Sequence, residues 1–236
     1  MDNYTYTGNE LDVFAGAANW KKYFTSIFKS YLRGSVLEVG AGIGSNTPYL
    51  LNSNISSFTC LEPDRILVSR IEEKVKQHHL PELLGIICGT TSDIPADKQF
   101  DAILYIDVIE HIEDDKAELN RARNLLKQGG SLIILVPAFN SLYTEFDKEI
   151  GHYRRYVKKT LRPAIPEGFE LKKLIYLDSA GFFASLANKL LFSNSKANPK
   201  VIKFWDQVLV RFSILADKIL FHTFGKSLVG IWQKTA

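Results

Sequence analysis

The chain has 236 residues, of which 46% are hydrophobic, and this is enough to bury a full core in one large domain. Its two cysteines, Cys60 and Cys88, lie in apolar runs that are typical of strands, so we expect buried thiols, no disulfide framework and a reducing cytoplasmic compartment. The sequence gives no signal-peptide pattern after Met1 and no apolar run of about 20 residues that could span a bilayer.

Charged residues are unevenly distributed along the chain. Residues 1–150 carry 14 Lys/Arg and 21 Asp/Glu, whereas residues 151–236 carry 15 Lys/Arg and 5 Asp/Glu. The basic C-terminal part predicts an anionic partner, such as a phosphate-bearing substrate, a membrane surface or a nucleic acid. A solvated basic face without a partner explains the same charges, and the sequence leaves both interpretations open.

The first element that the pattern predicts is helical. Apolar and aromatic residues recur at intervals of three or four between residues 9 and 32, which is typical of one amphipathic helix or a pair of them. Gly34 then interrupts the pattern before the first strand.

Three glycines at alternate positions, Gly40, Gly42 and Gly44, follow the apolar run 36–39. A helical segment over residues 46–51 comes next, so the stretch predicts a buried strand, a tight turn and a helix N-terminus. Glycines remove the side chains that would keep a ligand away from the backbone, and the N–H groups of such a turn can face the ligand. The turn therefore predicts a site for a nucleotide-like cofactor.

The spacing of this turn distinguishes between cofactors. The third glycine comes one residue earlier than in the dinucleotide fingerprint, and the chain has no phosphate-binding P-loop pattern. Instead, the segment resembles the glycine motif of the class I S-adenosylmethionine-dependent methyltransferase family. That resemblance implies that the turn binds the methionine half of the cofactor, through Glu38, Gly40, Ala41, Gly42 and Gly44.

The second predicted strand, residues 58–61, ends at Glu62, which precedes Pro63 and a predicted helix with Asp64 as its N-cap. A carboxylate at this place can accept hydrogen bonds from both hydroxyls of a ribose. An NAD enzyme would place an acid there as well. The resemblance implies that Glu62 holds the ribose and that Pro63 lies against the adenine.

The third predicted strand, residues 84–88, runs into a segment that resembles the adenine-binding segment of the family. Thr90 stands where the family usually has an acid, so the resemblance implies that Thr90 and Thr91 lie at the adenine. A threonine oxygen can accept a hydrogen bond without carrying charge. Alternatively, Asp93 takes over this contact.

A fourth strand is predicted over residues 100–107, followed by a turn that also fits the family. Asp107 then lies where the strand meets the cleft, near the methionine end of the cofactor. His111 can act as a proton acceptor or can simply shape the pocket through hydrogen bonds. A helix over residues 116–126 should end at the Gly129–Gly130 pair, before an apolar strand at 131–136.

Strands alternate with helices over residues 35–136, which predicts an open parallel α/β sheet. Further strands are predicted at residues 170–176 and 227–232. With the resemblance, this gives an expected Rossmann-like sheet of seven mostly parallel strands, with helices on both faces, an antiparallel last strand and a helical insertion before it.

A second informative stretch, residues 140–156, leaves the carboxyl end of the fifth strand, where ligands of open α/β sheets bind. Its aromatic and basic residues suit a sugar, phosphate or carboxylate group. We expect His152, and after it His111, as the catalytic base, and no metal ligands. Alternatively, Arg154 and Arg155 form ion pairs that hold the loop closed. The expected substrate-binding residues are Tyr143, Arg154, Arg155 and Tyr156.

Two helical segments are predicted before the last strand, at residues 182–192 and 201–221. The second combines a continuous apolar stripe with lysines and arginines. Such an insertion can be a lid, a dimer face, an amphipathic helix on a membrane, or a helix that packs on its own domain. Peripheral membrane contact through residues 200–221 would be compatible with a cytoplasmic protein.

We expect a single methyltransferase domain over residues 1–236. Its parts are leading helices (1–33), a cofactor-binding core (34–136), a substrate loop and sixth strand (137–180), the helical insertion (181–226) and the last strand (227–236).

The expected function is methyl transfer from S-adenosylmethionine, with S-adenosylhomocysteine as product, to an oxygen or nitrogen of a small-molecule, sugar/glycan or lipid-linked acceptor. A nucleic-acid acceptor is disfavoured, because the basic residues are mixed with an apolar stripe. Two other classes stay open: an NAD-dependent oxidoreductase and a non-catalytic cofactor-binding module of the same fold.

Overall fold

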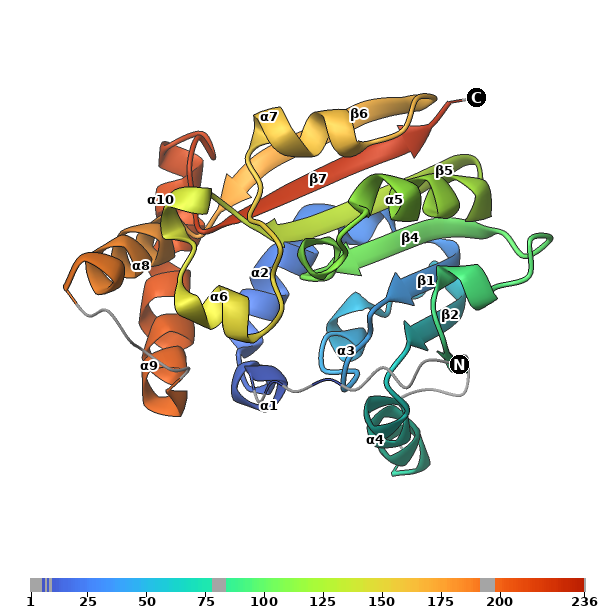
Figure 1. Cartoon of the computed structure of the whole chain (residues 1–236), viewed down its shortest axis with the longest axis horizontal. Coiled ribbons are helices and arrows are strands. Elements are labelled where there is room, and N and C mark those ends of the chain that lie inside the picture. Colours follow the sequence, from blue (N-terminus) through green and yellow to red (C-terminus); the bar gives the residue numbers. More distant parts are fainter. Residues whose placement is uncertain (1–5, 7, 9, 78–83, 192–197, 236) are drawn as a thin grey trace.

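The computed structural model describes residues 6, 8, 10–77, 84–191 and 198–235 (Figure 1). Its centre is a seven-stranded sheet in the order β3-β2-β1-β4-β5-β7-β6. The strands are β1 Gly34–Val39, β2 Ile55–Glu62, β3 Leu84–Cys88, β4 Phe100–Ile106, β5 Leu126–Pro137, β6 Phe169–Leu177 and β7 Ser227–Lys234.

The first five strands are parallel, and β7 is antiparallel to both of its neighbours, β5 and β6. The predicted fold class is therefore confirmed. Because β1 lies between β2 and β4, the order of the strands reverses beside β1. In open α/β sheets, ligands bind beyond the carboxyl ends of the strands at such a reversal.

Helices cover both faces of the sheet. They are α1 Glu10–Ala15, α2 Ala18–Phe28, α3 Thr47–Leu50, α4 Arg65–Lys76, α5 Asp115–Leu125, α6 Glu145–Glu149, α7 Lys158–Leu161, α8 Ser179–Leu191, α9 Pro199–Phe204 and α10 Val210–Ile219. One apolar cluster joins the sheet to α2, α4 and α10, with Phe24, Ile71 and Val210 at its centre. A second cluster joins the other face to α5 through Leu119 and Leu125. Alternate strand residues thus face different clusters, as in a sheet that is buried on both faces.

The chain differs from the sequence-based expectation where α5 ends. The helix stops at Leu125, and β5 already begins at Leu126, which pairs with Phe100. Both of these side chains are fully buried, so packing against β4 starts the strand earlier than its apolar run suggests. The glycine pair lies inside β5, beside an irregularity in the pairing with β4, and does not end the helix.

The helical insertion is anchored to the leading helices by buried carboxylates. Asp206 accepts a hydrogen bond from the backbone N–H of Trp20 at 2.8 Å, and Asp217 accepts one from the Tyr23 hydroxyl at 2.7 Å. Between α9 and α10 the chain forms a π-helical turn, Trp205–Leu209. In Figure 1, α6, α8 and α9 lie at the end of the sheet toward which the arrowheads of β1, β4 and β5 point.

Candidate functional site

A cavity of about 1690 Å³ lies where the glycine turn, the loop after β4, the loop around α6 and the helices α1, α8 and α9 meet. It brings together many residues that the sequence predicts for the site. Those that line it are Gly40, Ala41, Gly42, Asp107, His111, Tyr143, His152 and Arg155. The other predicted residues are not part of its lining: Glu38, Gly44, Glu62, Pro63, Thr90, Thr91, Arg154 and Tyr156.

The glycine turn presents bare backbone to the cavity. Gly40 and Gly42 have φ angles of 65° and 57°, in the left-handed region that disfavours side chains. The N–H groups of Gly40 and Ala41 donate to the carbonyl of Leu61 at 2.8 and 3.1 Å, which ties the turn to β2. Among the described residues, a Cβ atom on Gly42 would have only the Leu11 side chain, at 3.5 Å, as a neighbour. The turn therefore keeps open the space that a cofactor would fill.

Glu62 is held in place at the end of β2 by backbone donors. Its two oxygens accept hydrogen bonds from the N–H groups of Gly42, at 2.8 Å, and Asp64, at 3.0 Å. Burial raises the pKa of this carboxyl to about 6. A carboxylate has about four acceptor positions, so about two are left for the hydroxyls of a ribose. The residues at the turn thus fit S-adenosylmethionine.

Glu38 lies beneath the turn and not at its surface. It is 1% exposed, and its carboxylate accepts a hydrogen bond from the Thr47 hydroxyl at 2.8 Å. Burial raises its pKa to about 7. The direct cofactor contact expected for Glu38 is therefore corrected: we propose that it supports the turn from behind. Gly44 likewise faces away from the cavity, with Ile71 of α4 3.3 Å from the position of a Cβ atom.

The segment after β3 uses its polar groups internally. Both the N–H and the hydroxyl of Thr90 donate to Asp93, at 2.7 and 2.9 Å, and these bonds hold the pKa of the Asp93 carboxyl below its usual value. Thr91 is buried and donates its hydroxyl to Glu118 at 2.9 Å. Thr91 therefore points toward α5, contrary to its expected place at the adenine. For Pro63 and Thr90 this contact stays a prediction.

The loop after β4 places three titratable side chains at the far end of the cavity. Asp107 has a φ angle of 52°, and its side chain is open to the cavity while the surrounding protein limits its hydration and raises its pKa. Glu110 is 0% exposed, and burial, together with the charge of Asp107, raises its pKa well above the usual value. Burial and His152 lower the pKa of His111 to about 4, so its imidazole is neutral near pH 7.

His152 reaches this group from the loop that follows α6. Its Nδ1 lies 2.8 Å from the Asp147 carboxylate, and Arg155 donates to both oxygens of the same carboxylate at 2.8 and 3.0 Å. Because a carboxylate only accepts hydrogen bonds, Nδ1 of His152 carries a proton, and in the neutral tautomer Nε2 has a lone pair. The His152 and His111 rings lie edge to face, with centroids 4.5 Å apart.

Two of the expected substrate-binding residues have structural roles instead. Arg154 pairs with Asp115 at 3.0 Å and donates to the carbonyl of Glu113 at 2.7 Å. Tyr156 is 2% exposed and donates its hydroxyl to Asp115 at 2.6 Å. Neither side chain lines the cavity, because both are drawn toward the start of α5. The alternative prediction, ion pairs that hold the loop closed, describes Arg155 and Asp147.

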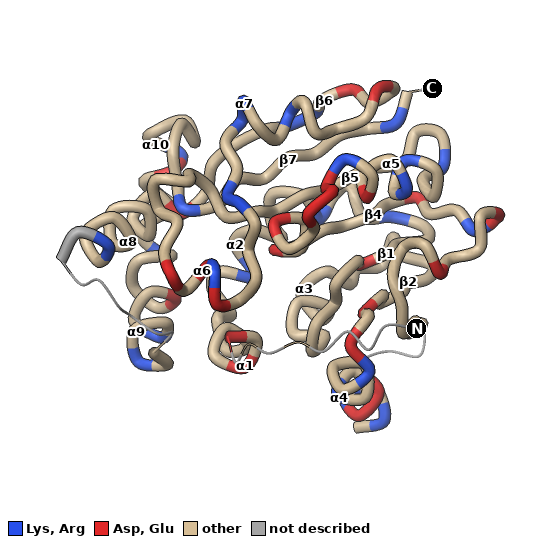
Figure 2. Tube along the Cα trace, in the orientation of Figure 1, with Lys and Arg blue, Asp and Glu red and all other residues tan. Residues whose placement is uncertain are grey.

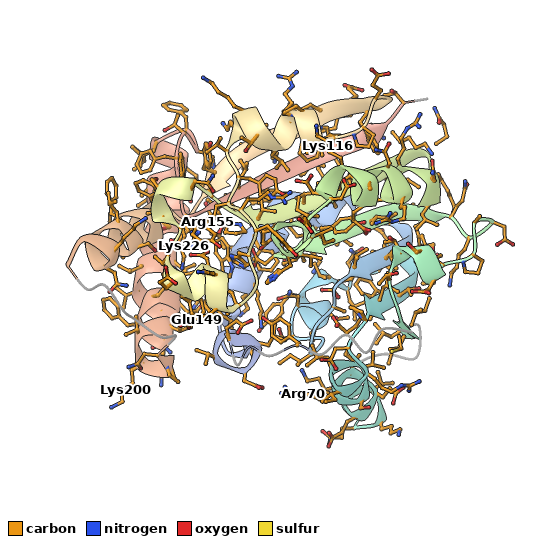
Figure 3. The ribbon with its side chains drawn as sticks, viewed as in Figure 1. Arg70, Lys116, Glu149, Arg155, Lys200 and Lys226 are labelled. Carbon is orange, nitrogen blue, oxygen red and sulfur yellow. The ribbon has the colours of Figure 1, made fainter. Side chains whose placement is uncertain are left out.

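Tyr143 lines the cavity and donates its hydroxyl to the carbonyl of His152 at 2.6 Å. Lys226 and Arg155, labelled in Figure 3, line the same cavity. The sequence analysis missed Lys226, as well as Glu10 of α1 and Lys21 of α2. Lys21 is 3% exposed, and burial lowers its pKa to about 8. A charged residue inside an otherwise apolar helical stripe was the only signal that could have indicated Lys21.

Comparisons with known proteins agree with this geometry. A family model described as a methyltransferase domain matches residues 37–134. An uncharacterized protein of Methanocaldococcus jannaschii is 29% identical over 179 residues, which are 73% of this chain and 68% of that protein. A demethylmenaquinone methyltransferase of Tropheryma whipplei is 27% identical, with 72% of this chain and 64% of that protein covered.

A ribosomal RNA large subunit methyltransferase E of Methanospirillum hungatei is 25% identical, with 70% of this chain and 72% of that protein covered. The names of these relatives therefore do not agree on one class of acceptor. Among solved structures, the N-methyltransferase NodS of Bradyrhizobium japonicum, crystallised with S-adenosylhomocysteine, has a TM-score of 0.61 and 12% identity. The comparison covers 100% of this chain and 94% of that structure, and it shows the shared fold.

The matched segment runs from β1 to β5 and contains the glycine turn, Glu62 and the loop after β4. The comparisons thereby confirm the predicted family, enzyme class and cofactor. They give no support to the NAD-dependent alternative. Residues 37–134 of the chain therefore form a methyltransferase domain of the class I S-adenosylmethionine-dependent type.

Proposed function

We propose that the chain transfers the methyl group of S-adenosylmethionine to an oxygen of a lipid-linked acceptor that it takes from a membrane surface. One observation carries this proposal: large apolar side chains form an exposed stripe along α9, the π-helical turn and α10, and the first members of this stripe line the cavity. No helix in the described part of the chain is long and apolar enough to cross a membrane.

We call this feature the apolar stripe. Its members follow one another at intervals of three or four and are between 49% and 66% exposed: Val201, Phe204, Val208, Phe212, Leu215 and Ile219. Residues with this spacing lie on one face of a helix. Large apolar side chains gathered in this way mark an interaction surface. Val201 and Phe204 also line the cavity, so the apolar stripe leads into the site.

The charges around the apolar stripe favour an anionic lipid surface over a protein partner. Lys200, Lys203, Arg211 and Lys218 lie on the same helices, where Figure 2 shows α9 with basic residues. An amphipathic helix with basic flanks inserts its apolar face into the headgroup region, and anionic lipids strengthen the binding. A lipid-linked acceptor could then enter the cavity without first crossing water.

The chemistry at the cavity divides between its two ends. When it is bound, S-adenosylmethionine supplies a methyl group on a positively charged sulfur, which makes that carbon electrophilic. Glu62 and the glycine turn hold the cofactor, and α1 covers the turn and excludes water from it. Asp107, His111 and Nε2 of His152 face the other end, where the acceptor oxygen would be positioned in line with the methyl group. The relative named as a demethylmenaquinone methyltransferase supports a lipid-like acceptor and gives no information on the acceptor atom.

Vesicle binding tests the proposal directly. We expect the protein to sediment with vesicles of phosphatidylcholine and phosphatidylglycerol, and less with phosphatidylcholine alone. The double variant Phe212→Glu/Leu215→Glu should lose this binding, because it places two charges on the apolar stripe. Ile66→Glu is a matched control, since Ile66 is 67% exposed on α4, away from the stripe. Wild-type protein that stays in the supernatant with both vesicle types would contradict the proposal.

The acceptor class is tested with radiolabelled S-adenosylmethionine and a total lipid extract reconstituted in vesicles. We expect the label to enter the organic phase with wild-type protein and to be lost with the double variant, while binding of S-adenosylhomocysteine is kept by both. Label that enters only a water-soluble acceptor from a cell extract would overturn the lipid-linked assignment.

A further inference from the structure

We propose that Glu110, His111 and His152 bind a divalent metal ion at the acceptor end of the cavity. One possible ligand atom of each residue lies within 4.8 Å of those of the other two. Two of the residues are neighbours in the turn after β4, and the third comes from the loop after α6. No metal ligands were expected from the sequence, in which His152 is remote from the other two residues.

The state of Glu110 independently indicates a missing ligand. Neither carboxylate oxygen has a hydrogen-bond partner among the residues that the structure describes, although the side chain is 0% exposed. Burying a carboxylate without partners is costly, and such groups in proteins are paired or coordinate metals. Its Oε1 lies 4.0 Å from Nε2 of His152, which is too far for a hydrogen bond. An ion about 2.1 Å from each atom would fit between them.

His152 is oriented for this role by a second layer of contacts. Its Nδ1–H donates to Asp147, which is itself fixed by Arg155 and by the hydroxyl of Thr144, 3.0 Å away. Metal-ligating histidines almost always donate their other ring N–H to a carboxylate, carbonyl or water, which fixes the tautomer and the direction of the ring. The arrangement thus directs the Nε2 lone pair of His152 toward Glu110.

The open side of the three residues faces the cavity. Glu110, His111 and His152 all line it, as does Asp107, which is exposed to it. Three protein ligands with an accessible fourth position are typical of catalytic metal sites. Two imidazoles and one carboxylate suit Zn²⁺ and also accept Mn²⁺, which favours oxygen ligands more.

The role of the ion rests on the proposed function. An acceptor hydroxyl bound at the open position would have a lower pKa and would release its proton to water. The oxygen then forms the bond to the methyl carbon while the S–CH₃ bond breaks and its electron pair stays on sulfur. The products are the methyl ether, S-adenosylhomocysteine and one proton. In this account His152 is a metal ligand and not the base that the sequence suggested.

Metal binding can be measured without acceptor or cofactor. Chelator-treated protein is titrated calorimetrically with Zn²⁺ and with Mn²⁺, and the bound metal is counted by mass spectrometry after dialysis. We expect one ion per chain, and an affinity at least about tenfold lower in Glu110→Gln, which removes the ligand charge at constant size. Asp147→Asn should weaken binding about 10- to 100-fold through His152. Glu113→Gln is the matched control, because Glu113 is exposed in the same loop.

Binding of S-adenosylhomocysteine by each variant checks that it is folded. The proposed metal site would be overturned if the wild-type protein bound no ion. It would also be overturned if the wild type and Glu110→Gln bound the ion with the same affinity. If vesicle binding and methyl transfer to lipid persist in that case, the proposed function stands. If the ion binds as expected but no lipid is methylated, the metal site stands and the proposed function fails.

Discussion

The cofactor end and the acceptor end of the cavity are built differently. At the cofactor end, the carboxylate of Glu62 is held by two backbone N–H groups, and the turn is tied to Leu61 of β2. At the acceptor end, Glu110 is buried without hydrogen-bond partners among the described residues, and Val201 and Phe204 of the apolar stripe line the same cavity. The first end is complete by itself, whereas the second is completed only by what binds to it.

The two ends also differ in which segments of the chain form them. The cofactor end is made from one strand, its turn and the end of the next strand, which parallel pairing brings together. The acceptor end needs the loop after β4, the loop after α6, α1 and the helical insertion to meet. A substitution at the cofactor end should therefore change one binding constant, whereas one at the acceptor end should change stability, metal binding or membrane binding as well.

The largest effect is expected for Asp147→Asn, because Asp147 is 1% exposed and pairs with both His152 and Arg155. Removing one partner of a buried ion pair costs about 3–5 kcal/mol of unfolding free energy. Thermal or urea unfolding, followed by circular dichroism, measures this change. Asp97→Asn, at an exposed position, is the matched control and should unfold like the wild type.

The stability difference between the wild type and Asp147→Asn should also depend on pH. Burial alone would raise the pKa of Asp147, but hydrogen bonds from His152 and Arg155 hold it below its usual value of 3.8. A carboxyl with a lowered pKa in the folded state stabilises the protein above its unfolded pKa, and this stabilisation is lost as the pH falls through the folded pKa. The stability difference between wild type and Asp147→Asn should therefore be full at pH 7 and should shrink below about pH 4. An equal difference at pH 7 and pH 3 would show that the ion pairs are not its cause.

The next largest effect is expected for Gly42→Val, which fills the space beside the turn. Binding of S-adenosylhomocysteine should weaken roughly 100-fold, or by about 2.7 kcal/mol, in isothermal titration calorimetry. Gly129→Val controls for backbone strain, because Gly129 has a φ angle of 73° and a Cβ atom there would meet no atom of the described residues within 4 Å. Equal affinities of Gly42→Val and Gly129→Val for S-adenosylhomocysteine would contradict the assignment of the glycine turn as the cofactor end.

A smaller effect is expected for Glu62→Gln, which weakens hydrogen bonds to the ribose by about 1.5 kcal/mol, the lower end for hydrogen bonds to charged groups. The pKa of Glu62 is about 6, so the wild-type carboxyl takes up a proton as the pH falls below that value, and its affinity for S-adenosylhomocysteine should fall with it. The variant should lose this part of the pH dependence. Calorimetric titrations at pH 7.5 and pH 5 in both proteins separate the two outcomes; parallel profiles would exclude Glu62 as the titrating contact.

The smallest effect is expected for Thr90→Ala. Thr90 is exposed and its hydrogen bonds go to Asp93, so the free energy of unfolding should change by no more than about 0.5 kcal/mol. The affinity of this variant for S-adenosylhomocysteine tests whether Thr90 contacts the adenine. A loss of more than tenfold would show that Thr90 contacts the adenine, as the family resemblance implies, and an unchanged value would leave that contact to another residue.

The sequence could predict the sheet and the cofactor end because their signals are local. The apolar runs, the three glycines and the acid at residue 62 all lie within short segments with a fixed period or spacing. The N-cap at Asp64 is an example, since its carboxylate accepts from the N–H of Ile66 at 2.7 Å. The end of α5 was wrong because burial of Leu126 against Phe100 outweighs the glycine signal.

The acceptor end could not be predicted in the same way because it depends on contacts remote in sequence. The local pattern gave Arg154 and Arg155 equal weight, but the fold turns one toward Asp115 and the other toward Asp147. Similarly, neither His111 nor His152 alone indicates a metal ligand. Only the folded chain shows that both lie beside Glu110, a buried carboxylate without hydrogen-bond partners among the described residues.

The central claim is that one cavity places the cofactor at the glycine turn and the acceptor at the Glu110–His111–His152 end. A crystal structure with S-adenosylhomocysteine and Mn²⁺ tests it most directly. We predict the ribose hydroxyls on Glu62, the sulfur directed toward Asp107, and an anomalous peak for Mn²⁺ between Glu110, His111 and His152. The ligand bound elsewhere, or an empty glycine turn with Mn²⁺ only on surface carboxylates, would contradict the account.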